Sequence, residues 1–191
     1  MNRIDLPGEP FVAGPTALRP WRDTDLHWVV EACQDPEIPR WTSVPSPYGE
    51  SDARSFLLRR YDWLETGTEA PFAIVKSEDI DRGLVGSVSL LRFAWEHRRC
   101  EVGYWLAREA RGQGHATRAV AVLCAWGFRE LRLERIELLA ATGNLLSQRV
   151  AERAGFTREA VLRSHKQSKH GRLDMVIFSL LPEELGLARP L

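Results

Sequence analysis

Hydrophobic residues recur along the 191-residue chain in two patterns, one typical of helices and one typical of strands, and these patterns predict its secondary structure. Apolar residues recur at helical spacing in four places. In seven shorter segments, β-branched, aromatic and aliphatic residues gather between charged or glycine-containing turns. We therefore predict helices at about 24–33, 52–64, 112–131 and 144–154. We predict strands at 16–20, 72–76, 83–92, 98–106, 135–141, 156–163 and 173–181.

Polar residues and glycines indicate where these helices begin and end. The segment Asp23–Asp25 offers N-cap oxygens for the first helix. Gly155 stands where a helix C-terminus commonly requires a left-handed residue, and the apolar Phe156 follows it. Residues 35–49 show neither period, so we expect an irregular segment there.

The order of these elements, β-α-α-β-β-β-α-β-α-β-β, predicts one α/β (α+β) domain. The early strands are joined by short turns and should be antiparallel, whereas a long helix joins the fourth strand to the fifth. The expected architecture is a mixed, mostly antiparallel seven-stranded sheet with helices on both faces. Residues 1–15 hold three prolines and two glycines and are expected to form a flexible N-terminal arm. The domain would then cover 16–182, and 183–191 would form a C-terminal tail.

The amino-acid composition narrows the class of protein but does not indicate a function. Twenty-six basic residues balance 26 acidic ones, so no overall field draws the chain to nucleic acid or to a membrane. The three cysteines are odd in number and far apart, which is typical of reduced thiols. We see no signal peptide and no apolar run of membrane-spanning length. The expected location is the cytoplasm.

The glycine loop between 110 and 117 is the most informative segment. It leads directly into the long helix, whose first N–H groups and positive dipole end attract anions. Gly112 and Gly114 let the backbone approach a ligand closely, while Arg111 and Arg118 add positive charge. The loop is therefore a predicted anion site, and a diphosphate is the expected guest.

Two common nucleotide loops fit this segment poorly. An ATP-type loop would end in Gly-Lys-Ser/Thr, where this chain has His115, Ala116 and Thr117. A dinucleotide fingerprint requires a third glycine where Thr117 stands, and it should open the first βαβ unit of a domain.

The loop resembles the acyl-CoA loop of the GNAT acetyltransferase superfamily, Gln/Arg-x-x-Gly-x-Gly/Ala, through Arg111, Gly114 and Ala116. The order of several other segments is similar to the RimJ/RimL-like branch, over about residues 16–181. These segments are Thr16-Ala17-Leu18-Arg19-Pro20, Glu101-Val102-Gly103-Tyr104-Trp105-Leu106, Asn144-Leu145-Leu146-Ser147, Ala154-Gly155-Phe156 and Gly171-Arg172-Leu173-Asp174.

The resemblance implies a GNAT fold whose sheet splays between strands four and five. It also implies acetyl-CoA as co-substrate, and a primary amine, on a protein N-terminus or a small molecule, as acceptor. The sequence leaves open whether the protein forms a homodimer. A larger donor such as succinyl-CoA and a non-catalytic acyl-CoA-binding protein stay open as alternatives. The expected cofactor-binding residues are Trp105, Leu106, Ala107, Arg111, Gly112, Gln113, Gly114, His115, Ala116, Thr117 and Asn144.

Two side chains are the candidate catalytic groups. By the resemblance, Ser147 donates a proton or a hydrogen bond to the leaving sulfur, although it could be an ordinary first-turn serine. Many relatives use a tyrosine downstream of this point, and here all three tyrosines lie upstream of it. Glu101 could accept the amine's proton. Its alternative role is an ion pair with Arg98, Arg99 or Arg135.

The remaining reactive residue types suggest no further chemistry. The five histidines are scattered without close Cys, His or Asp partners, so no metal site is predicted. Cys100 and Cys124 lie in predicted elements and should be core residues, which favours direct transfer over an acyl-enzyme. Among the tryptophans, Trp21, Trp28 and Trp41 cluster where related enzymes build an acceptor wall, or else they hold a long loop in place.

Overall fold

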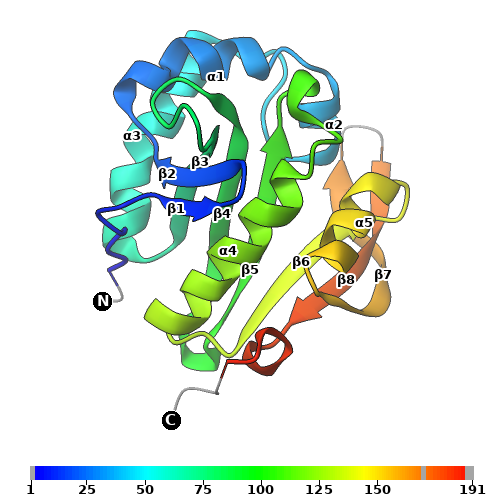
Figure 1. Cartoon of the computed structure of the whole chain (residues 1–191). Helices are drawn as coiled ribbons and strands as arrows, with labels where there is room; N and C mark the ends of the chain where they lie inside the picture. The colour runs from blue at the N-terminus through cyan, green and yellow to red at the C-terminus, as the bar shows by residue number, and fades with distance from the viewer. Residues whose placement is uncertain (1–2, 169–170, 188–191) are drawn as a thin grey trace.

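An open sheet of eight strands, in the order β1-β2-β3-β4-β5-β6-β8-β7, organises the chain (Figure 1). The computed structural model describes residues 3–168 and 171–187. The strands are β1 (Phe11–Ala13), β2 (Thr16–Pro20), β3 (Glu69–Lys76), β4 (Leu84–Ala94), β5 (Arg99–Leu106), β6 (Arg135–Ala141), β7 (Thr157–Ser168) and β8 (Gly171–Leu180). All neighbouring pairs are antiparallel except β5 and β6, which confirms the mixed, mostly antiparallel sheet.

Five α-helices accompany the sheet in the described residues: α1 (Leu26–Ala32), α2 (Glu37–Trp41), α3 (Glu50–Thr66), α4 (His115–Glu130) and α5 (Leu145–Arg153). The short α2 lies inside the segment expected to be irregular. Gly155 adopts φ +91° just beyond α5, and Phe156 donates its N–H to the Ala151 carbonyl, so the predicted helix end is confirmed.

The predicted number of seven strands is wrong by one, because β1 lies in the expected N-terminal arm. Phe11 pairs with Leu18, and Gly14 at φ +59° makes the turn into β2. Ile4 is also buried and donates its N–H to the Leu64 carbonyl. Three paired residues are too few to show an alternating pattern, so the sequence gives no sign of this strand.

The C-terminal segment also continues the fold beyond its expected boundary. A 3-10 turn covers Pro182–Leu185, and Leu185 and Leu187 pack against the core. Residues 188–191 of the expected tail lie outside the described residues.

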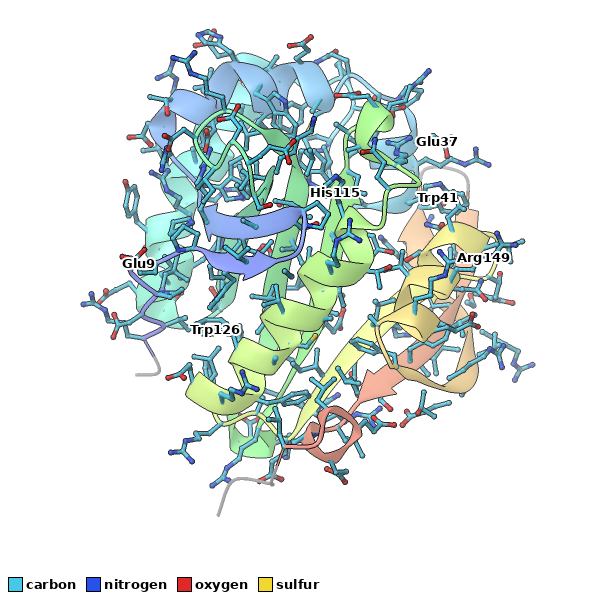
Figure 2. All side chains as sticks on the ribbon, viewed as in Figure 1. Glu9, Glu37, Trp41, His115, Trp126 and Arg149 are labelled. Atoms are coloured by element: carbon cyan, nitrogen blue, oxygen red, sulfur yellow. The ribbon has the colours of Figure 1, made fainter. Side chains whose placement is uncertain are left out.

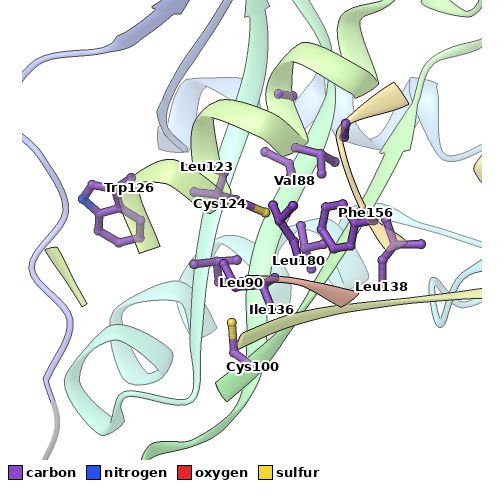
Figure 3. Close-up of a cluster of buried hydrophobic side chains, with 14 of the residues drawn as sticks. Val88, Leu90, Cys100, Leu123, Cys124, Trp126, Ile136, Leu138, Phe156 and Leu180 are labelled. Atoms are coloured by element: carbon purple, nitrogen blue, oxygen red, sulfur yellow. The ribbon is translucent and has the colours of Figure 1, made fainter. Parts of the chain in front are cut away.

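Successive side chains of each strand point to opposite faces of the sheet, so the buried residues form two hydrophobic cores, one on each face. Phe72 and Ile74 of β3 belong to the larger core under α4 and α5, whereas Ala73 and Val75 join the core under α1 and α3. Figure 3 shows the larger core, with Leu123 of α4 above the sheet residues. None of the described helices combines the length and the apolar content needed to cross a bilayer.

The sheet splays open between β5 and β6, as the resemblance implies. These strands pair in parallel only at Arg99–Arg135, Cys100–Ile136 and Glu101–Glu137. Beyond Glu101 the strands diverge, although β5 stays paired with β4 as far as Leu106. The vertex of the splay is therefore at Glu101, and its open end faces the start of α4 (Figure 1).

Candidate active site

The glycine loop leaves the first turn of α4 without a protein cap. Gly112 and Gly114 both adopt φ +79°, and Gly114 is the N-cap residue. Because glycine has no side-chain oxygen, no side-chain cap is formed there, and the first turn contains no acidic residue. The free N–H groups and the positive helix end suit an anion. The predicted helix start at 112 is too early, because the left-handed glycines delay regular helix to His115.

Arg118 links the glycine loop to β2 through two hydrogen bonds. Its Nη2 donates to the Gln113 carbonyl at 2.6 Å, and its Nε donates to Thr16 Oγ1 at 2.9 Å. Thr16 Oγ1 also lies 2.9 Å from His115 Nδ1, so the two side chains share a hydrogen bond. Burial, followed by Arg118, lowers the pKa of His115, which is consistent with a neutral ring. The network connects β2 to α4.

Arg111 is held on the other side of the loop. Its Nε and Nη2 donate to the Leu106 carbonyl at 3.2 and 2.9 Å. Its Nη2 also lies 2.6 Å from the carboxylate of Asp35, which is nearly buried. Asp35 thus links the turn after α1 to the end of β5. The sequence offers no signal for this contact, because 76 positions separate the two residues.

A cavity of about 950 Å³ runs from this loop through the splay to the segment around α2. Most of the expected cofactor-binding residues line it, namely Trp105, Leu106, Arg111, Gly112, Gly114, Ala116, Thr117 and Asn144. Ala107, Gln113 and His115 are absent from the wall. The Ala107 N–H donates to the Val85 carbonyl at 3.0 Å, so it is engaged within the sheet. The Gln113 side chain turns back to the Glu109 carbonyl, and the His115 side chain is buried.

Glu101 lines the cavity at the vertex of the splay. Its ion-pair partner is Arg92, whose Nη1 donates to Glu101 Oε2 at 2.6 Å. None of the three arginines considered from the sequence has that role: Arg98 pairs with Glu134, and Arg99 and Arg135 pair with Glu137. The Glu101 side chain remains 21% exposed, so this ion pair leaves it accessible from the cavity.

Ser147 lines the same cavity from the first turn of α5. The Asn144 side chain caps that helix, accepting the Ser147 N–H at 3.1 Å. Tyr104 of β5 reaches across and donates its hydroxyl to Ser147 Oγ at 2.9 Å. From the sequence, Tyr104 was noted only to lie upstream of Ser147, and this contact was not predicted.

Glu69 is a second carboxylate of the cavity that sequence reasoning missed. It stands in register with Leu91, which is opposite Glu101, so both glutamates belong to one row across three strands. Burial raises the pKa of Glu69, although a hydrogen bond with Ser89 acts in the opposite direction. Within the residues that the structure describes, no cation lies within ion-pair distance of its carboxylate.

The substitution Glu69→Gln is expected to stabilise the protein at pH 8 but not at pH 4. A raised pKa means that the fold favours the protonated acid, so wild-type stability declines as the pH rises through that pKa. Glutamine does not ionise and escapes this loss. Thermal unfolding midpoints of both proteins across this pH range measure the difference. Glu31→Gln, on the exposed face of α1, should show no such trend, and a constant offset for Glu69→Gln would contradict the burial argument.

Aromatic side chains form part of the cavity wall. Trp41, Tyr48, Phe56, Trp63 and Trp105 all line it. Figure 2 shows Glu37 and Trp41 of α2 at the same end of the molecule as Arg149 of α5. Trp21 and Trp28, expected in the same wall, form an aromatic array behind it, in which Trp28 stacks on Trp105 at 5.9 Å.

The cysteines lie in the core. Cys33, Cys100 and Cys124 are all buried, and burial raises the pKa of each thiol. Such thiols stay protonated and are poor nucleophiles. Across residues 3–168 and 171–187, no group of three or more His, Cys, Asp or Glu side chains is arranged to hold a metal ion.

The splayed mixed sheet, with the uncapped start of α4 at its open end, has a geometry that suits an extended anionic ligand. A family model described as an acetyltransferase (GNAT) domain matches residues 16–157. The chain therefore belongs to the GNAT acetyltransferase family.

Individual relatives agree with this family. The chain is 38% identical over 104 residues to the "Putative ribosomal N-acetyltransferase YdaF" of Bacillus subtilis (strain 168), covering 54% of this chain. It spans only 57% of the length of that relative. It is 29% identical to "Uncharacterized N-acetyltransferase p20" of Bacillus licheniformis, over 87% of this chain and 93% of that protein.

Solved structures share the fold. A RimL structure, described as a ribosomal L7/L12 alpha-N-protein acetyltransferase in complex with coenzyme A, superposes with a TM-score of 0.81. The superposition covers 91% of this chain and 98% of the RimL chain, and the two sequences are 16% identical. At this identity the likeness concerns the fold alone.

Proposed function

We propose that this protein is an N-acetyltransferase that moves an acetyl group from acetyl-CoA to a primary amine by direct attack. The acceptor is a protein N-terminus or a small-molecule amine, and the reaction takes place in the cytoplasm. The single observation that carries the proposal is the cavity itself, because one continuous space joins the uncapped start of α4 to Glu101 and Ser147. The names of the relatives support the same reaction class.

The donor's diphosphate fits the glycine loop. The N–H groups of the first turn of α4 are free. Gly114 adopts φ +79°, where a side chain would be strained, so this position favours glycine. The diverging edges of β5 and β6 leave backbone groups that an extended pantetheine arm can bind. The Leu106 carbonyl accepts a hydrogen bond from Arg111. Arg111 would have to give up this bond for the pantetheine arm to bind that carbonyl.

Glu101 is the proposed general base. An alkylammonium must lose a proton before it attacks, and an α-amine with a pKa near 8 requires less help than a lysine near 10.4. The Glu101 carboxylate, at the vertex of the splay, lines the same cavity as the aromatic side chains and the glycine loop. It can take the proton directly or through a water molecule.

Ser147 is the proposed group at the leaving sulfur. When the C–S bond breaks, its electron pair stays on sulfur, and a thiol pKa of about 8.5 makes that thiolate a tolerable leaving group. A hydrogen bond from Ser147 is therefore enough, and full protonation is not needed. The buried, protonated cysteines support direct transfer without an acyl-enzyme.

The proposal is tested by incubating the protein with acetyl-CoA, or succinyl-CoA, and a panel of peptide N-termini and small amines. Release of free thiol and the mass of the acylated product are followed. Turnover with acetyl-CoA on at least one amine is the expected result. Binding of acetyl-CoA without turnover on any amine would favour the sensor alternative, and preference for succinyl-CoA would change the donor.

The substitution Glu101→Gln is expected to lower kcat about 100-fold at neutral pH, within the usual range for general-base catalysis. The loss should shrink at high pH, where the amine is already neutral. Arg92→Met is the matched control, because it breaks the same ion pair while keeping the carboxylate. If both variants lose activity equally at every pH, the ion pair is structural and Glu101 is not the base.

A further inference from the structure

The Tyr104–Ser147 contact joins β5 to α5, two elements whose contact was not predicted from the sequence. Tyr104 lies on β5, between Gly103 and Trp105, and Ser147 lies 43 residues later on α5. The two oxygens are 2.9 Å apart, and both residues line the cavity at the splay. The contact therefore spans the gap between the diverging halves of the sheet.

The direction of this hydrogen bond decides what Ser147 can do. Tyr104 is the donor, so one lone pair of Ser147 Oγ is occupied and the proton of Ser147 is free. The Ser147 N–H is already engaged by Asn144, which fixes the backbone of the residue. A hydroxyl that accepts one hydrogen bond is also a better donor of the next, because the two bonds polarise each other.

We propose that Tyr104 is a positioning residue of the transfer reaction: its phenol orients Ser147 so that the serine proton points at the leaving sulfur. This inference rests on the proposed function and adds one residue to its mechanism. The serine of the helix and the tyrosine of the strand form a single unit in this chain. Ser147 is the member that touches the substrate.

Tyr104 keeps its proton throughout the reaction. Burial raises the pKa of Tyr104 to about 12, even though its hydrogen bond to Ser147 acts in the opposite direction. A thiolate whose conjugate acid has a pKa of about 8.5 is too weak a base to remove that proton. The electron pair of the C–S bond stays on sulfur, Ser147 donates a hydrogen bond to it, and the proton lost by the amine goes to Glu101.

The test is a double-mutant cycle with Tyr104→Phe, Ser147→Ala and the double variant, measured as kcat for acetyl transfer. Tyr104→Phe should lower kcat about 5- to 10-fold in the wild-type background, the effect of losing one hydrogen bond. In the Ser147→Ala background it should have no further effect. The affinity for CoA and the unfolding midpoint should stay close to those of wild type.

Two replacements at position 104 keep the test decisive. The residue p-aminophenylalanine retains a donor at the same place and should restore most of the lost kcat. If Tyr104→Phe fails to fold, p-fluorophenylalanine fills the volume of the hydroxyl without a donor and takes its place in the cycle. Equal losses in both backgrounds, or no loss in either, would overturn the positioning role. Absence of turnover in the wild-type protein would instead refute the proposed function.

Discussion

The substitution Gly114→Glu is expected to abolish binding of acetyl-CoA. At φ +79° a side chain is strained, and its Cβ would lie 2.7 Å from Arg118 Nη1. The new carboxylate would itself occupy the positive start of α4 and repel the diphosphate. When acetyl-CoA is present at 100 times its dissociation constant, the free energy of unfolding of the wild-type protein rises by about 2.7 kcal/mol. This raises the unfolding midpoint by several degrees. The variant should show no such shift.

Two further variants separate the causes of that loss. Gly8→Glu adds the same charge where nothing lies within 4 Å of the new Cβ, and it should bind acetyl-CoA like wild type. Gly114→Ala adds strain without charge and should weaken binding without abolishing it. Retained affinity in Gly114→Glu, with the unliganded fold intact, would show that the loop is only a helix start.

The substitution Asp25→Ala is expected to lower the free energy of unfolding by about 3–5 kcal/mol, the usual cost of leaving one member of a buried ion pair alone. Arg19 donates to both oxygens of Asp25, at 2.8 and 2.9 Å. The two side chains are only 2% and 4% exposed. Asp25 also accepts the Arg22 N–H, so it fixes the turn between β2 and α1. Urea unfolding measures the effect.

The matched control is Arg54→Ala. This substitution breaks the Arg54–Glu50 ion pair, whose 2.6 Å distance is similar to that of the Arg19–Asp25 pair. Both side chains of the Arg54–Glu50 pair are more than half exposed. Solvent-screened pairs of this spacing contribute about 0.3–0.5 kcal/mol. A loss below 1 kcal/mol for Asp25→Ala would mean that the turn relaxes and lets water reach Arg19.

The sequence predicted those features of the site that depend on local order. The glycines at 112 and 114 and the missing cap at the start of α4 are properties of one short segment, so they could be inferred without coordinates. The splay followed from the family resemblance. Asn144 was predictable as an N-cap because capping is local.

The missed features depend on which side chains meet across the sheet. The Arg92 partner of Glu101 comes from the bulge at the end of β4, and Glu69 enters the site because β3 and β4 share one register. Tyr104 was assessed by its position in the chain, whereas its distance to Ser147 depends on how β5 and α5 pack. Periodicity assigns a residue to a face of a strand and cannot identify the residue that it contacts.

The three residue pairs that join β5 to β6 make the sheet two sheets with a short common seam. Five strands lie on one side of the seam and three on the other. Amide hydrogens along Val102–Leu106 that point away from β4 should therefore exchange rapidly with solvent deuterium, although β5 is an interior strand of the sheet. A ligand in the splay would protect them, and slowed exchange at these positions would report occupancy of the donor site without any acceptor being known.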